Sequence, residues 1–314
     1  MSKKTYQQDI ADSLGISRNA VSRALRGCSD ISKSTIEKVK LKANELGYIA
    51  NNLSTYLSSG KVKLFSIVVF NLRNVYFSLM ADALIKQIEK EGYQVIVTVY
   101  QRPSINVEQM KEILSTQCAG VFSLINVDED AIELCEKNNT PITLIGSKSV
   151  NPYASTFTVN DYQGSRLIGE RLLQLNAAKP CFLCPIDPGV VQNRQRGIED
   201  VFKERKGPKL DIYFESFEND IYNIFANQIL KNNNDYVVAY SDEIAINVKR
   251  ILHLHAKYVY GFDGIHKQLP IISEVNGLSN DWGEEVKDAV ADMMIKIQNS
   301  SRPTGLDKVY LLSL

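Results

Sequence analysis

The pattern of hydrophobic positions changes its period about 60 residues into the chain. Up to residue 49, apolar residues recur at helical spacing in three short segments. Beyond residue 62, short apolar runs alternate with amphipathic segments of helical length. The runs that predict buried strands are 64–70, 95–99, 120–122, 142–145, 181–184, 236–239, 258–260 and 309–312. Such alternation is typical of βαβ units, and so many strands favour two doubly wound parallel sheets over one.

The first 50 residues predict three short helices. Gly15 ends the first helix, because a left-handed residue costs least when it is glycine, and Ser17 is a good N-cap for the second. Ser32 or Ser34 can cap the third, which Gly47 closes. The positions expected on the buried faces are Ile10, Ala11, Leu14, Val21, Ala24, Leu25, Ile36, Val39, Ala43 and Leu46. This order predicts a helix-turn-helix, whose second helix enters the DNA major groove N-terminus first.

The outward face of that second helix carries residues that suit DNA. Arginine reads guanine and asparagine reads adenine by paired hydrogen bonds, which points to Arg18, Asn19 and Arg23. The hydroxyls of Ser17 and Ser22 suit phosphates. The alternative is a generic three-helix bundle with a polar surface.

Charge separates the two parts of the chain. The 36 basic and 36 acidic residues balance, but residues 1–61 hold ten of the basic and five of the acidic ones. A basic headpiece on an acidic body is the electrostatic pattern of a nucleic-acid-binding protein. The polar stretch 51–60 is expected to be a linker. The chain has no run of about 18 apolar residues and no apolar signal-peptide core at its start, so the expected location is the cytoplasm, at the nucleoid.

The stretch from Ala11 to Leu25 resembles the DNA-binding signature of the lactose-repressor (LacI/GalR) family, and the similarity continues through residues 34–39 and 45–48 into the body. The resemblance implies an N-terminal all-α helix-turn-helix headpiece and an α/β, two-lobed body similar to periplasmic binding proteins. The implied parts are a headpiece (1–49), a hinge (50–61), and an effector-binding and dimerisation body (62–314). The body's lobes would be about 62–161 with 279–300, and about 162–278 with 301–314.

In this family the linker is a hinge helix that folds on operator DNA and presses a leucine between base pairs from the minor groove, which favours deformable steps. Leu57 stands at that position, and Ala50 replaces a proline that the family often has. The alternative for Leu57 is a solvated linker residue. The DNA-contacting residues that the resemblance implies are Thr5, Tyr6, Ser17, Arg18, Asn19, Ser22, Arg23, Asn51, Leu53, Ser54, Tyr56 and Leu57.

The resemblance also implies an effector cleft between the lobes. The implied ligand-binding residues are Tyr76, Arg194, Phe217, Ser241 and Asp263. Two aromatic rings, a guanidinium donor and a carboxylate acceptor suit a polyhydroxylated ligand, a sugar or sugar derivative. For any one of these residues, the alternative is a surface salt bridge or a satisfied polar group in the core.

Several pocket positions depart from the family. Gly146, Ser241 and Gly277 stand where Asp, Asn and Gln are common, and Asn160–Asp161 reverses the usual order. The ligand is then a larger, phosphorylated or non-sugar compound, or a partner protein, or the pocket has lost its function.

Nothing in the sequence indicates an enzyme, a cofactor or a metal site. The Cys181–Cys184 spacing lies within an apolar strand run, which favours buried cysteines. His253 and His255 are two residues apart and fall on different helix faces. No phosphate-binding glycine loop or nucleophile motif occurs.

The sequence therefore predicts a homodimeric repressor of carbohydrate-utilisation genes that binds a near-palindromic operator under the control of a small ligand. The first alternative is a cytoplasmic module that binds a ligand or a partner protein and for which DNA binding is secondary. A solute-binding protein and a sugar-modifying α/β enzyme are the other two.

Overall fold

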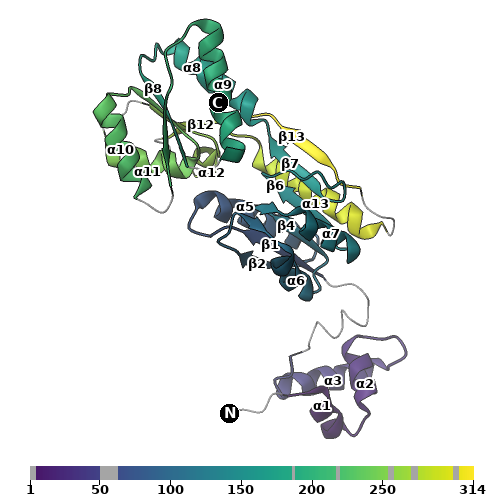
Figure 1. The fold of residues 1–314 in the computed structure, drawn as a ribbon. Helices are drawn as coiled ribbons and strands as arrows, with labels where there is room; N and C mark the ends of the chain where they lie inside the picture. Colours follow the sequence, from purple (N-terminus) through teal and green to yellow (C-terminus); the bar gives the residue numbers. More distant parts are fainter. Residues whose placement is uncertain are drawn as a thin grey trace. The chain divides into compact units, whose positions relative to one another are not determined.

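The computed structural model describes residues 5–49, 63–185, 188–216, 220–253, 258–269, 275–299 and 304–314. The chain divides into two compact units, residues 1–62 and 63–314 (Figure 1). The hinge positions 50–61, with Asn51, Leu53, Ser54, Tyr56 and Leu57, and the cleft candidate Phe217 lie outside the described residues.

The first unit is built of three helices, α1 (Gln7–Leu14), α2 (Arg18–Leu25) and α3 (Lys33–Glu45). Gly15 has a left-handed φ of 63°, which lets α1 end and α2 begin two residues later. The Ser17 hydroxyl caps α2 by accepting the Ala20 N–H at 3.1 Å, and Ser32 caps α3. The residues at the centre of the bundle are Ile10, Ala11, Val21, Ala24, Val39 and Ala43.

One expected core position is wrong. Leu46 is 37% exposed, because α3 ends at Glu45 and Leu46 is its C-cap rather than a further residue of the buried stripe. Leu14, Leu25 and Ile36 are half-buried against the central residues.

The body contains two parallel sheets, as predicted. The first has the order β13-β7-β6-β4-β1-β2. Its strands are β1 (Leu64–Val69), β2 (Gln94–Val99), β4 (Gly120–Ser123), β6 (Ile142–Ile145), β7 (Ser155–Val159) and β13 (Asp307–Tyr310). A small two-stranded sheet pairs β3 (Ser104–Ile105) with β5 (Asn126–Val127).

Helices cover both faces of this first sheet. They are α5 (Val75–Lys90) and α13 (Trp282–Gln298) on one face, and α6 (Val107–Ser115) and α7 (Glu129–Lys137) on the other. Side chains of β1 alternate between the two layers: Phe65, Ile67 and Val69 pack with α5 and α13, whereas Val68 packs with α6 and α7. Burial on both faces explains why the strand is apolar except at Ser66, which is itself buried.

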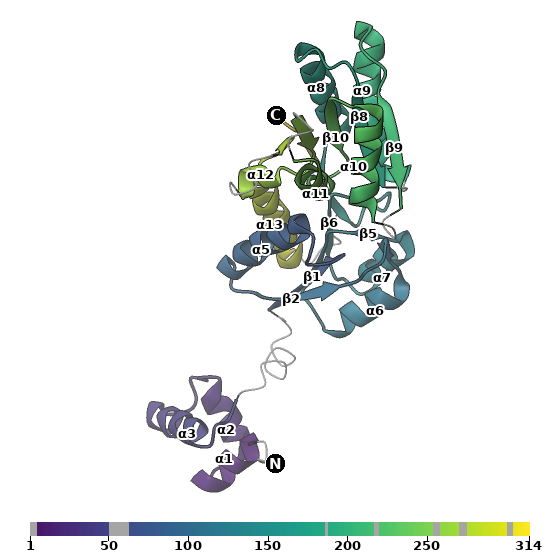
Figure 2. The same ribbon diagram turned by 90° about the vertical axis from the view of Figure 1, so that its left-hand side faces the viewer.

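The second sheet has the order β12-β11-β10-β8-β9. Its strands are β8 (Pro180–Pro185), β9 (Asp211–Glu215), β10 (Tyr236–Ala239), β11 (Tyr258–Gly261) and β12 (Asn276–Gly277). Its helices are α8 (Asp161–Gln174), α9 (Pro188–Arg205), α10 (Ile221–Asn232), α11 (Asp242–Leu252) and α12 (Ile265–Gln268). The pair α8 and α9 covers one face and the pair α10 and α11 covers the other (Figure 2).

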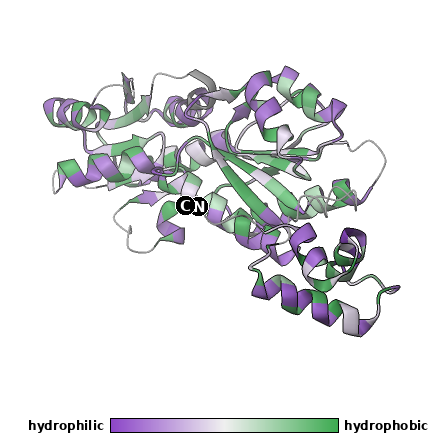
Figure 3. Ribbon diagram, turned by 90° about the horizontal axis from the view of Figure 1, so that it is seen from below, coloured by the Kyte–Doolittle hydropathy of each residue, from purple (hydrophilic) through white to green (hydrophobic). Residues whose placement is uncertain are grey.

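Hydropathy follows this layering. The strands of both sheets are largely hydrophobic, and the covering helices alternate between hydrophobic and hydrophilic positions (Figure 3). Cys181 and Cys184 are buried free cysteines in β8, which confirms their structural interpretation. None of the described helices combines the length and the apolarity that crossing a membrane requires.

The expected boundary between the lobes is wrong at the C-terminus. The sequence assigns residues 301–314 to the second lobe, but β13 pairs with β7 in the first sheet, with Asp307 opposite Thr156. This pairing satisfies the backbone of β7, which would otherwise be an edge strand. The chain then returns, because Leu312 packs in the core of the second lobe and Ser313 bridges Ser279.

Candidate functional site

The exposed start of α2 carries the residues predicted to read DNA. Ser17, Arg18 and Asn19 are exposed and Arg23 is half-buried. The Arg23 guanidinium forms an ion pair with Asp30 in the loop between α2 and α3. This ion pair helps to orient the Arg23 side chain. The Ser17 hydroxyl accepts the capping hydrogen bond from the Ala20 N–H, and its own proton remains available to donate to a phosphate.

The residues before α1 are tied to the bundle. The Thr5 hydroxyl donates to the Leu46 carbonyl at 2.8 Å, and the Asp9 carboxylate accepts the Tyr6 N–H at 2.7 Å. The Tyr6 side chain is exposed. Thr5 is therefore positioned by the end of α3, beside an exposed aromatic ring.

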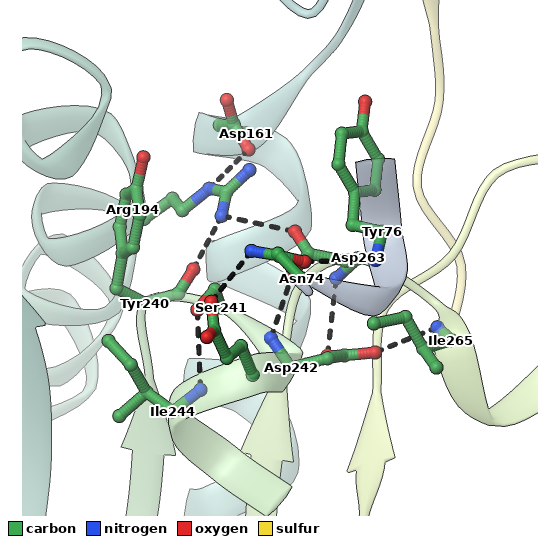
Figure 4. Close-up of polar contacts among 11 residues, drawn as sticks. Asn74, Tyr76, Asp161, Arg194, Tyr240, Ser241, Asp242, Ile244, Asp263 and Ile265 are labelled. Carbon is green, nitrogen blue, oxygen red and sulfur yellow. Dashed lines mark hydrogen bonds and ion pairs between the residues drawn. The ribbon is translucent and has the colours of Figure 1, made fainter. Parts of the chain in front are cut away.

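The body contains a cavity of about 670 Å³ at the carboxyl ends of the strands of both sheets. Four of the predicted ligand-binding residues line it together: Tyr76, Arg194, Ser241 and Asp263. They come from α5 in the first lobe and from α9, the end of β10 and the end of β11 in the second (Figure 4). Residues distant in sequence therefore converge on one cavity, as the resemblance implies.

Arg194 is a buried anchor of this cavity. Its Nε donates to Oδ1 of Asp161 at 2.7 Å, and its Nη1 donates to the Tyr240 carbonyl and lies 3.7 Å from Oδ1 of Asp263 (Figure 4). The rings of Tyr240 and Phe262 flank the guanidinium, with centroids 4.9 and 4.7 Å from it. These contacts fix the plane of the group before any ligand binds.

Asp263 is held by reciprocal bonds with the start of α11. Its Oδ2 accepts the Asp242 N–H at 2.9 Å, while the Asp242 carboxylate accepts the N–H groups of Asp263 (3.2 Å) and Ile265 (2.8 Å). Burial and the charge of Asp242 raise the pKa of Asp263 above its ordinary value, although Arg194 acts in the opposite direction. Ser241 caps α11 through the Ile244 N–H.

Tyr76 lies in the first turn of α5. Its N–H is bound by the side chain of the N-cap residue Asn74 at 2.9 Å, and its ring meets Trp282 edge to face at 5.5 Å. Burial and the nearby Glu285 raise the pKa of the Tyr76 hydroxyl far above its usual range, so the hydroxyl remains a hydrogen-bond donor. Gly146 lines the cavity with a φ of 79°, and a Cβ there would stand 3.6 Å from this hydroxyl.

Some lining residues were not foreseen from the sequence. Gly277 does not line the cavity, but Asn280, which follows it before α13, does. Asn280 donates its Nδ2 to Oε2 of Glu285 at 2.6 Å. Ser147 and Thr158 also line the cavity, and their hydroxyls are buried without a hydrogen-bond partner in the described part of the chain. These are groups that a ligand can satisfy.

The sequence contains a weak indication that Asn280 lines the cavity, but none for Glu285. Asn280 and Asp281 are polar residues between a strand and a helix, the position at which open α/β sheets place ligand contacts. Glu285 carried no signal, since a carboxylate in the first turn of a helix is usually exposed and favoured by the helix dipole.

The sequence is similar to the sucrose operon repressor of Streptococcus mutans, with 24% identity over 82% of each chain. It is also similar to the ribose operon repressor of Lactococcus lactis, with 20% identity over 98% of this chain and 90% of that one. No protein-family model matches it. The fold is similar to that of the lac repressor dimer bound to operator and the anti-inducer ONPF, with a TM-score of 0.78, 18% identity, and coverage of 99% and 98%.

The sequence relatives extend over both units of the chain, and the structural relative shares the fold of both. The Ala11–Leu25 signature lies on α1 and α2 of the headpiece. The chain is therefore similar in sequence to operon repressors and similar in fold to the lac repressor over both of its units.

Proposed function

We propose that the chain is a sequence-specific DNA-binding repressor of carbohydrate-utilisation genes whose operator affinity is set by a small ligand in the cleft of the body. The observation that carries the proposal is the pairing of two features in one chain. A Ser17-capped helix exposes Arg18 and Asn19, and a separate unit holds a 670 Å³ cavity built around Arg194 and Asp263. The names of the sucrose and ribose operon repressors support the class of genes.

The headpiece divides the work of binding between two sets of groups. Lysines, serines and backbone amides bind phosphates and provide an affinity that falls with salt. Arg18, Asn19 and Arg23 select bases in the major groove, and Leu57 wedges the minor groove. The protein acts in the cytoplasm as a homodimer, because two headpieces then occupy half-sites about one helical turn apart.

The body converts ligand binding into a change at the DNA. The lobes are joined where β7 leads to α8, where β12 leads to α13, and after β13. A ligand that binds both sides of the cleft favours one rotation of the lobes. By linkage, the ligand and the operator then alter each other's affinity by the same factor.

Selection from random DNA with the full chain tests the proposal. The expected result is a near-palindrome with a deformable centre. Replacing Arg18 and Asn19 together by Ala should abolish this enrichment while leaving salt-dependent binding to any sequence. Lys38→Ala is the control, because this exposed lysine of α3 lies outside the reading helix and its loss should affect all sequences equally. Enrichment that survives loss of Arg18 and Asn19 would exclude α2 as the reading helix.

A further inference from the structure

The basic groups of the cavity are already largely engaged. Arg194 contacts the carboxylates of Asp161 and Asp263, at 2.7 and 3.7 Å. The one other basic residue among the described lining residues is Lys148, which is exposed. An anionic ligand would therefore compete with the carboxylates of Asp161 and Asp263 for Arg194, the buried cation of the cavity. It would also lose its own hydration on entering the cavity.

Glu285 is the opposite case, a buried carboxyl for which the described residues provide no counter-ion. It is 3% exposed, lies in the first turn of α13 and lines the cavity. The Asn280 amide donates to one of its oxygens, and no basic side chain of the described residues forms an ion pair with it. A buried carboxylate without a cation is costly, and burial raises the pKa of Glu285 to about 7.

Two aromatic residues line the same cavity as this carboxyl. Tyr76 and Trp282 line the cavity and pack edge to face, and the charge of Glu285 acts on the Tyr76 hydroxyl. Unlike Tyr240 and Phe262, these two rings do not flank Arg194. A carboxylate beside aromatic rings is the arrangement that binds an organic cation.

We propose that the effector is a polyhydroxylated compound that carries an ammonium group. The ammonium group binds Glu285 beside Tyr76 and Trp282, and the hydroxyl groups of the ligand bind Arg194 and Asp263. Among the described lining residues, the three carboxyl groups of Asp161, Asp263 and Glu285 outnumber the basic groups of Lys148 and Arg194. The positive charge of the ammonium group would balance this difference. This inference rests on the proposed function, since it names the chemistry of the same effector site.

Titration calorimetry on the full chain at neutral pH tests the inference with matched probes. D-Glucosamine is compared with D-glucose, and D-glucamine with D-glucitol. Each amine should bind at least about tenfold more tightly than its neutral partner. A tenfold ratio of dissociation constants corresponds to a binding free energy of about 1.4 kcal/mol, which is typical of a hydrogen bond to a charged group. N-Acetyl-D-glucosamine, which has no charge, should lose the advantage. Equal affinities within pairs, binding of no amine, or tightest binding of D-glucose 6-phosphate would each overturn the inference.

Variants locate the ammonium site. Glu285→Gln keeps an oxygen for Asn280 but removes the charge, so it should reduce amine affinity about tenfold and leave the neutral probes unchanged. Glu284→Gln, the exposed neighbour on the same helix turn, and Lys148→Gln should keep the preference. An amine preference that survives in Glu285→Gln would also overturn the inference. Operator selection without amine preference overturns this inference alone, whereas amine preference without operator selection overturns the proposed function alone.

Discussion

Asn74 and Glu243 join the two lobes across the cleft. Nδ2 of Asn74, the N-cap of α5 in the first lobe, donates to Oε2 of Glu243 on α11 in the second lobe at 2.7 Å. The other Glu243 oxygen accepts the Tyr222 hydroxyl at 3.1 Å. The oxygen of the same Asn74 side chain binds the N–H of Tyr76. One residue therefore connects the bond between the lobes with a wall of the cavity.

Glu243→Ala should favour separation of the lobes. It removes a charged hydrogen bond between them, which is worth about 1.5 kcal/mol or roughly a tenfold change in the closed population. Distances between fluorophores on the two lobes check this, with Glu170→Ala, an exposed residue of α8, as the control. An unchanged distance distribution would mean that other contacts hold the cleft.

Glu285→Gln should change the dependence of stability on pH. The folded-state pKa of Glu285 is about 7, above its ordinary 4.5, so the folded protein holds this proton more tightly than the unfolded chain. Ionisation of the buried Glu285 carboxyl therefore lowers the stability of the folded protein. This loss of stability is absent below about pH 4.5, grows as pH rises and is complete above pH 7, where it reaches about 3 kcal/mol. The variant should therefore be more stable than the parent at pH 8 and equal to it at pH 4.5. Denaturant titrations at both pH values measure this, and equal stability of the variant and the parent at pH 8 would contradict it.

Arg194→Ala should destabilise the body strongly. Removing the guanidinium leaves the largely buried carboxylates of Asp161 (15% exposed) and Asp263 (13% exposed) without their cation, a loss of about 3 kcal/mol. Denaturant unfolding of the full chain measures the loss. Arg166→Ala is the matched control, because its pair with Glu204 lies at the surface and its removal should have a far smaller effect. Comparable losses in the two variants would show that the Arg194 network stabilises the body no more than a surface ion pair does.

Ser17 should separate stability from DNA binding in the headpiece. Ser17→Ala removes the cap of α2 and should cost about 1 kcal/mol, seen as faster amide hydrogen exchange in that helix. Ser17→Asp keeps a capping oxygen and should preserve slow exchange, yet weaken DNA binding through repulsion by phosphate. Equal DNA affinity of the aspartate variant and the parent would remove Ser17 from the DNA interface.

Local interactions made much of the fold predictable. The limits of α1, α2 and α3 follow from Gly15, Ser17 and Ser32, whose effects reach only a few residues along the chain. Strands that are almost entirely apolar, such as β1 and β10, are predictable because both of their faces are buried. By contrast β7 was missed, since Ser155, Thr156 and Thr158 interrupt its apolar pattern although all three are buried.

Other features depend on contacts between distant parts of the chain. The pairing of β13 with β7 joins residues about 150 positions apart, and no local pattern specifies which sheet the last strand enters. Likewise, the helical period marks Val286 and Ala289 as buried, but it does not show that the first turn of α13 faces the cavity. Whether Glu285 meets solvent or a closed cleft depends on how the chain crosses between the lobes. That crossing is a property of the packed sheets and not of the sequence around Glu285.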